Sequence, residues 1–366
     1  MAAVEKIPVI DCDGHVVETL PELAEFMDPT IRYVAETDRP FPSGVSVFPS
    51  LDGLHYQVDD LPRTALFENP KRKRVTASEN RAGSAADWIA LLGQTPIEQT
   101  VLFTSDGLSM GWLRQREYTI RICRAYNDYM AARFAIDRRL HPMAIIPMQF
   151  PEEAVKELRR AVKELGLLGA MVPSTGLPLH LGHEFFWPVY KEASDLECAL
   201  AVHGGCNGGI GLDSFDRLLH SHILHHPVPL MIAFVATVCG GLFERFPGLR
   251  IAFLEGGVGW VAMLYDRIER ERELGAGENL ELPQITKYLE SNRVLVGCEG
   301  NDQILPYLVK TLGARGFGYS SDYPHEADLV DVKREIDETL ENHELSRDDK
   351  AAILGGNARE FYRLGV

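Results

Sequence analysis

Long apolar runs, paired cysteines and an excess of positive charge are all missing from this sequence. No stretch of 18 apolar residues occurs, so no membrane-spanning helix and no membrane partner are expected. The first residues lack a basic segment followed by an apolar one, so no signal peptide is expected. Acidic residues number 53 against 37 basic ones, a net charge of −16. This balance argues against a nucleic-acid partner, because binding phosphates requires clustered cations.

The six cysteines are scattered, and none forms a C-x-x-C pair. Several lie within apolar runs, where cysteine behaves as a small buried hydrophobe. We therefore expect a reducing, cytoplasmic location, no disulfides and no cysteine-based zinc site. No G-x-S-x-G motif occurs either, so a serine-hydrolase nucleophile is not supported.

Short apolar, β-branched runs recur along the 366 residues, and each precedes a helical pattern. The eight runs are Ile7–Asp13, Thr100–Thr104, Met143–Pro147, Leu168–Pro173, Cys198–His203, Arg250–Glu255, Val294–Glu299 and Phe317–Asp322. Alternating strands and helices predict a parallel sheet, and eight such units predict an α/β fold of the (β/α)8 TIM barrel type. An open doubly wound sheet is the alternative, but no G-x-G-x-x-G follows the first strand.

One domain over residues 1–366 is expected, with a long insertion after the first strand, at about 20–98. We expect this insertion to cap the barrel mouth. Its basic run Lys71–Arg74 is either a solvated charge run or a contact for the phosphates of an anionic carrier. Residues 328–366 predict two C-terminal helices, Leu329–Asn342 and Ser346–Tyr362, and Ser346 and Asp349 have capping-box spacing.

Polar residues collect where the predicted strands end, which is where TIM barrels place their chemistry. They are Asp13, His15, His203, Glu255, Glu299 and Asp322. Four carboxylates meeting at one barrel mouth would repel one another unless cations lay among them. We therefore predict that these six residues are metal ligands, and two divalent metals would balance four carboxylates. A mixture of oxygen and imidazole ligands suits iron or manganese at least as well as zinc.

More imidazoles follow the fifth strand, at His222, His225 and His226. They are either surface residues of a polar loop or a source of one extra ligand or a proton shuttle. We name His225, together with Glu255, as the predicted catalytic residues. His325 and Tyr323 are expected to support the ligands, and to act in catalysis only if they face the metals.

Several motifs occur together along the chain, in this order: the first-strand Asp13-x-His15, His203, Phe243–Pro247, Glu255–Gly257, Ser321–Pro324 and Gly355–Ala358. In this the chain resembles the amidohydrolase-2 type of metal-dependent TIM barrel, which includes aminocarboxymuconate-semialdehyde decarboxylase and its relatives. The resemblance implies a metal at the strand ends. It places the family's first-strand H-x-H on Asp13 and His15, its fifth-strand histidine on His203 and its eighth-strand aspartate on Asp322.

The sequence also departs from that pattern. Asp13 replaces a histidine, Glu255 stands where the decarboxylases have an acid/base histidine, and Glu299 adds a carboxylate. The fourth strand ends Ala170–Pro173, without a lysine that could be carboxylated to bridge two zincs. These departures resemble a branch of the superfamily with a non-haem di-iron centre, which activates dioxygen and acts on substrates linked to coenzyme A.

The leading hypothesis is therefore a di-iron monooxygenase that hydroxylates a small or CoA-linked substrate. The alternative is a zinc- or manganese-dependent hydrolase or decarboxylase of a small carboxylated, amide or ester substrate, with Glu255 as general base. A barrel that serves only as a scaffold ranks third, since fold alone proves no activity. By analogy with the relatives, a homodimer is a candidate assembly.

Overall fold

The fold is known from a computed structural model that describes residues 7–36, 82–205, 209–215, 218–275, 282, 284–325 and 327–365. Its strands are β1 Val9–Val16, β2 Ile97–Thr104, β3 Leu140–Pro142, β4 Ala144–Ile145, β5 Gly169–Pro173, β6 Ala199–His203, β7 Arg250–Leu254, β8 Val294–Cys298 and β9 Phe317–Tyr319. Its α-helices are α1 Leu20–Phe26, α2 Pro29–Glu36, α4 Ala85–Leu92, α5 Arg116–Arg133, α6 Pro151–Lys163, α7 Trp187–Leu196, α8 Leu218–His225, α9 Pro227–Phe234, α10 Leu242–Arg245, α11 Gly259–Leu274, α12 Ile285–Glu290, α13 Leu305–Leu312, α14 Leu329–Glu341, α15 Arg347–Ala351 and α16 Asn357–Tyr362. Short 3-10 helices are η1 Asp106–Trp112, η2 Glu184–Phe186 and η3 Leu212–Ser214, and η4 Val235–Cys239 and η5 Ala352–Gly356 are π-helices.

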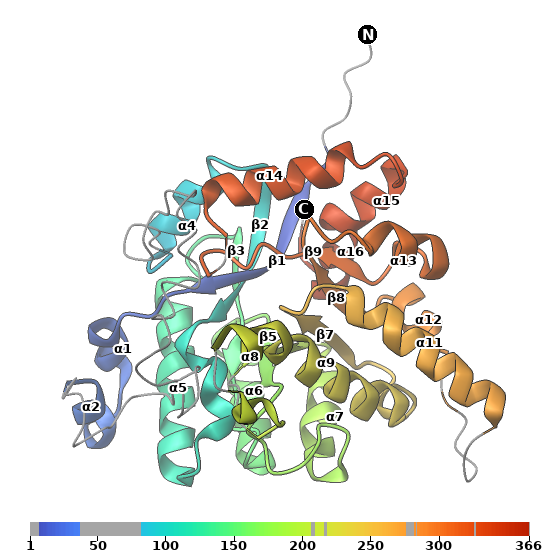
Figure 1. The fold of residues 1–366 in the computed structure, drawn as a ribbon. Helices are drawn as coiled ribbons and strands as arrows, with labels where there is room; N and C mark the ends of the chain where they lie inside the picture. The colour runs from blue at the N-terminus through green and yellow to red at the C-terminus, as the bar shows by residue number, and fades with distance from the viewer. Residues whose placement is uncertain are drawn as a thin grey trace.

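All strand pairs are parallel, in the orders β1-β2-β3 and β4-β5-β6-β7-β8-β9. β3 and β4 are two parts of one barrel strand, interrupted at Met143, whose N–H donates to Leu102 O at 2.9 Å. At the other seam, Asp322 N donates to Asp13 O at 2.9 Å and His15 N donates to Tyr323 O at 2.8 Å. Figure 1 shows β1 beside β9, the first strand next to the last. The predicted TIM barrel is confirmed.

Side chains of the strands alternate between two apolar clusters. In β6, Ala199 and Ala201 belong to one cluster, while Leu200 and Val202 belong to the other, which also holds the buried faces of α6, α7 and α9. This period of two is what a strand with one face to the barrel interior and one face to the helices requires. His203 continues the series of Ala199 and Ala201, so it points to the interior.

The helices pack outside the barrel, as their apolar spacing predicts. In α6, Ala154, Leu158 and Ala161 are fully buried, and Pro151 opens the helix. The capping box that Ser346 and Asp349 predict is present at the start of α15. One helical stretch, His220–Cys239, is long and apolar enough to span a membrane by length and composition alone. Its α9 portion packs against β6 and β7 of the barrel.

The segment between β1 and β2 contributes helices beside the barrel. α1 lies against α5, where Arg133 contacts Glu25 at 2.6 Å and the rings of Phe26 and Tyr129 lie 6.0 Å apart. α4 lies against the end of β1, because Trp88 Nε1 donates to His15 O at 3.2 Å. The Lys71–Arg74 run and most of the predicted cap lie outside the described residues.

Candidate functional site

The strand ends bring most of the predicted ligands together. His203 Nε2 lies 3.0 Å from Asp13 Oδ1, and His15 Nε2 lies 3.4 Å from the same oxygen. His15 Nε2 also lies 3.4 Å from Asp322 Oδ1. Within the described residues, two groups at these strand ends have ligand atoms close enough to share an ion: Asp13, His15 and His203, and His15, Asp322 and His325. The two groups share His15, so a single centre can draw on both.

Backbone conformation turns two of the acidic side chains into the mouth. Glu255 directly follows β7, and Asp322 lies three residues after the end of β9. Both have left-handed backbone, with φ of 63° for Glu255 and 47° for Asp322. L-residues seldom adopt this region, and such strain is typical of functional sites. The turn ends the extended chain at each position, and it lets the two carboxylates approach the histidines of neighbouring strands.

The arrangement around His15 fits a bound cation. Its Nδ1 lies 2.8 Å from the carbonyl oxygen of Thr104, so Nδ1 carries the proton in the neutral ring. The other nitrogen, Nε2, is buried, has no hydrogen-bond partner and faces the carboxylates of Asp13 and Asp322. A nitrogen lone pair facing two carboxylates is repulsive unless a proton or a metal ion lies between them. A ring fixed by a backbone carbonyl is also the usual form of a histidine that binds metal.

Charge in this site is concentrated on Asp13 and His203, both fully buried. Burial opposes ionisation of Asp13, but His203 and His15 outweigh it and lower its pKa to about 2. Burial likewise opposes protonation of His203, yet the carboxylates of Asp13 and Glu255 raise its pKa well above the usual range. The strand ends therefore hold a carboxylate that stays ionised, as a metal ligand must.

Glu255 approaches His203 from the side away from Asp13. Its Oε2 lies 3.1 Å from His203 Nδ1 and 3.3 Å from His226 Nδ1, and its Oε1 lies 3.9 Å from His325 Nδ1. Burial opposes its ionisation, but His226 and His203 hold the pKa of Glu255 well below the usual range. The Glu255 carboxylate therefore sits among three imidazoles, where it can orient His203 and exchange protons with its neighbours.

His325 is held beside the predicted metal ligands by groups that sequence reasoning missed. Its ring lies 4.0 Å from that of His15, and its Nε2 lies 2.8 Å from Ser105 Oγ. The N–H of Ser105 donates to both carboxylate oxygens of buried Glu18 at 3.1 Å. Burial raises the pKa of Glu18 to about 8. No motif marks Ser105 or Glu18, because their role depends on how the ends of β1 and β2 pack.

Asp11 is a second group that was missed. Its carboxylate accepts hydrogen bonds from Ser321 N at 3.0 Å, Ser321 Oγ at 2.9 Å and Thr100 Oγ1 at 3.0 Å. Burial raises the pKa of Asp11 to about 6. Asp11 thus ties the first strand to the segment that carries Asp322. The alternation Asp11-x-Asp13-x-His15 was the available signal for it.

Two predicted residues lie differently from the rest. Glu299 belongs to none of the candidate metal groups among the described residues. Burial raises the pKa of Glu335 to about 8, and the charge of Glu299 adds to this shift. The His225 ring lies 3.6 Å from that of His226, and His226 is the one of the two for which a direct contact with Glu255 is seen. Asp13, Glu255 and Asp322 contact the histidines at the strand ends, and the ligand role of Glu299 stays a prediction.

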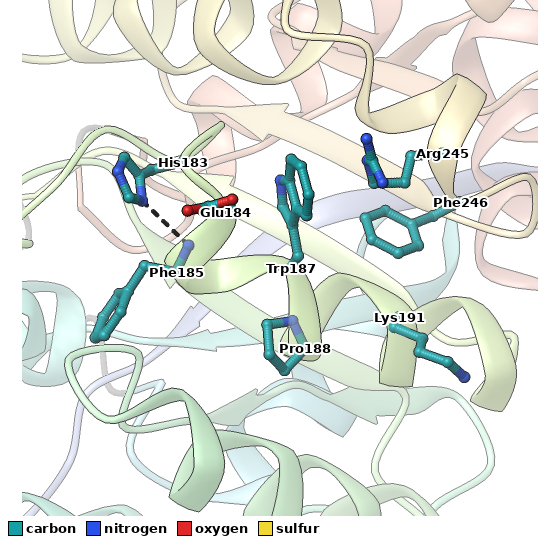
Figure 2. Close-up of a pocket in the computed structure, with 8 residues that line it drawn as sticks. All are labelled: His183, Glu184, Phe185, Trp187, Pro188, Lys191, Arg245 and Phe246. Atoms are coloured by element: carbon teal, nitrogen blue, oxygen red, sulfur yellow. Dashed lines mark hydrogen bonds between the residues drawn. The ribbon is translucent and has the colours of Figure 1, made fainter.

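A separate cavity of about 700 Å³ opens on the outer surface. Figure 2 shows its lining, formed by residues of η2, α7 and the end of α10, with the Arg245 guanidinium 3.8 Å from the centre of the Trp187 ring. His183 caps η2 there by accepting from Phe185 N at 3.1 Å. None of the strand-end residues lines this cavity, so it is not the site described above.

Comparison with known proteins identifies the family. The amidohydrolase family model (Amidohydro_2) matches residues 10–364. The chain is 26% identical to 2-amino-3-carboxymuconate-6-semialdehyde decarboxylase of Dictyostelium discoideum, over 75% of each chain. It is 28% identical to gamma-resorcylate decarboxylase of a Polaromonas species, over 66% of this chain and 76% of that one. It shares its fold with 5-carboxyvanillate decarboxylase of Novosphingobium aromaticivorans, crystallised with manganese, at a TM-score of 0.68, 19% identity and coverage of 100% and 98%.

These relatives correct the leading hypothesis from the sequence. The predicted monooxygenase activity is wrong, because the relatives are decarboxylases. Two irons stay a prediction: among the described groups that could hold an ion, neither Glu255 nor Glu299 takes part. An aspartate in place of a histidine equally suits a single oxygen-preferring ion such as manganese. None of these three relatives is named for a CoA thioester. The chain belongs to the amidohydrolase family.

Proposed function

We propose that this protein is a decarboxylase of a small carboxylic acid, dependent on one divalent metal at the barrel mouth. The observation that carries the proposal is the buried His15 Nε2, which has no hydrogen bond and faces the carboxylates of Asp13 and Asp322. The relatives supply the reaction class, since three of them are named as decarboxylases.

Asp13, His15, His203 and Asp322 would hold the metal. Two carboxylates and two imidazoles suit manganese or zinc. When bound, the ion would act as a Lewis acid and attract the anionic groups of the substrate. His15 is oriented by Thr104 O, and His203 by Glu255, so both rings are fixed before any ion binds.

The reaction breaks one carbon–carbon bond, and the carbon that loses CO2 must gain a proton. Glu255 stands at the end of β7, within 3.3 Å of His226 and 3.9 Å of His325. We assign it the acid/base role: its carboxylate, ionised at rest, takes a proton from the neighbouring imidazole of His325 and passes it to the carbon, and His325 regains a proton from solvent. Burial of this carboxylate keeps bulk water away from the carbon that is protonated.

The test is CO2 release by protein loaded with Mn²⁺. The first probes are 2,6-dihydroxybenzoate and 5-carboxyvanillate, with aryl esters and amides as probes for hydrolysis. We expect CO2 release from a hydroxylated aromatic acid, lost on chelation and restored by Mn²⁺. Asp322→Asn should abolish it, because a carboxylate ligand is removed. Metal-dependent hydrolysis without CO2 release would contradict the proposal and favour a hydrolase.

A further inference from the structure

Three histidines gather where α8 passes into α9. The ring centres lie 4.5 Å apart for His222 and His225, 5.5 Å for His222 and His226, and 3.6 Å for His225 and His226. Their spacing of three and four residues places them on one face of the helix. One ring nitrogen from each lies within 4.8 Å of the other two. This is the spacing of groups that can ligate a common ion.

The group is enclosed, yet it can be reached from solvent. His225 is buried, whereas His222 and His226 are partly exposed. Gly204 leaves room for this group of histidines, because a side chain at position 204 would clash with His226 and Glu255. The sequence therefore places three nitrogen donors and one small residue at the same point of the barrel wall.

Glu255 lies between this group and the strand-end site. Its Oε2 is 3.3 Å from His226 Nδ1 and 3.1 Å from His203 Nδ1. Both Glu255 Oε2 and His226 Nδ1 are buried. A cation on the three histidines would place positive charge next to this carboxylate.

We propose that His222, His225 and His226 form a second metal site, selective for a nitrogen-preferring ion such as Zn²⁺. Three imidazoles favour zinc over manganese, whereas the carboxylate-containing strand-end site accepts either ion. The second site does not depend on the reaction assigned above. Its role is to fix Glu255 and His226 in place from the side away from the first metal.

The test measures bound metal in the full-length protein, stripped with a chelator, reloaded with Zn²⁺ and desalted. We expect two zinc ions per chain in the wild type and one in His222→Ala. His220→Ala is the matched control, because His220 is an exposed histidine on the same helix, and it should retain two. His15→Ala should also retain one, since it removes the strand-end site and leaves the three histidines intact.

Titration with Zn²⁺ then resolves the two sites. His222→Ala should weaken the second binding step more than about 100-fold, since even the loss of a residue that only supports a ligand costs about 10–100-fold. His222→Phe, which keeps a ring but offers no nitrogen, serves if His222→Ala lowers the melting temperature. No zinc in His15→Ala, or two in both His222 variants, would overturn the proposal. Neither result bears on CO2 release, so the two proposals fail separately.

Discussion

Gly204→Ala should lower the catalytic rate and leave the folding free energy nearly unchanged. A methyl carbon at this position would lie 2.6 Å from Glu255 Oε2 and also press on His226 Nδ1, while ordinary contact begins at 3.4 Å. The Glu255 carboxylate must therefore retreat by about 0.8 Å. The Glu255 carboxylate ends a flexible side chain, and the partly exposed His226 ring can turn about its Cβ–Cγ bond, so we expect little change in folding free energy.

The catalytic cost should be much larger. A misplacement of about 1 Å in a reacting group costs on the order of 100-fold in rate. We therefore expect kcat/KM for CO2 release to fall about 100-fold, with one Mn²⁺ still bound, because His15 and Asp322 do not touch the new methyl group. The assay follows CO2 release, Mn²⁺ content and melting temperature on the same samples.

The control is Gly259→Ala, where an added Cβ meets nothing within 4 Å, on the exposed side of α11. It should behave as wild type in all three measurements. If Gly204→Ala folded and bound metal normally and also kept full kcat/KM, the placement of Glu255 would not matter to the reaction. The acid/base role assigned to Glu255 would then be refuted.

Two further predictions concern groups around the site. Burial and the charge of Glu299 raise the pKa of Glu335 to about 8. At neutral pH this carboxyl is therefore neutral in the folded protein and ionises on unfolding. Its contribution to the free energy of unfolding is complete below about pH 4.5 and is lost as the pH rises to 8. Glu335→Gln should therefore raise the free energy of unfolding at pH 8 by on the order of 2–5 kcal/mol and leave it unchanged near pH 4, measured by denaturation at each pH; equal gains at both would disprove the assignment. Ser105→Ala removes the 2.8 Å contact with His325 Nε2 and should lower kcat about tenfold at constant melting temperature, and Ser105→Thr should restore it. A Thr variant as slow as the Ala variant would show that the hydroxyl contact is not what matters.

The barrel could be predicted from local patterns because each strand carries its own signal. Alternation such as Ala199, Ala201 and His203 on one face and Leu200 and Val202 on the other depends only on neighbouring residues. Residue types that can bind metal could equally be predicted to meet at the strand ends, since parallel strands end at one rim of the barrel. The third strand was predicted in one piece, but it begins earlier and breaks at Met143, where the chain hydrogen bonds back to β2.

What could not be predicted depends on contacts between distant segments. Glu18 and Ser105 meet only because β1 and β2 are paired, and no spacing in the sequence shows it. Glu299 directly follows β8, and its charge helps raise the pKa of Glu335 of α14. Its ligand role stays a prediction, because residue type at a strand end indicates only a candidate.

The preference for an oxygenase came from residue identity read without its surroundings. Asp13 and Glu255 each replace a histidine of the family pattern, which suggested a richer carboxylate centre than one ion needs. In the structure Asp13 lies among the proposed ligands, whereas Glu255 contacts the far nitrogen of His203. In our proposal the two substitutions therefore affect different functions, one in holding the ion and one in moving protons.

Anomalous diffraction from crystals grown with Mn²⁺ tests the central claim most directly. A single strong peak should appear between Asp13, His15, His203 and Asp322, within coordinating distance of His15 Nε2 and His203 Nε2. No peak there in fully loaded crystals, with Asp13 and Asp322 still 3.4 Å from His15 Nε2, would contradict the account.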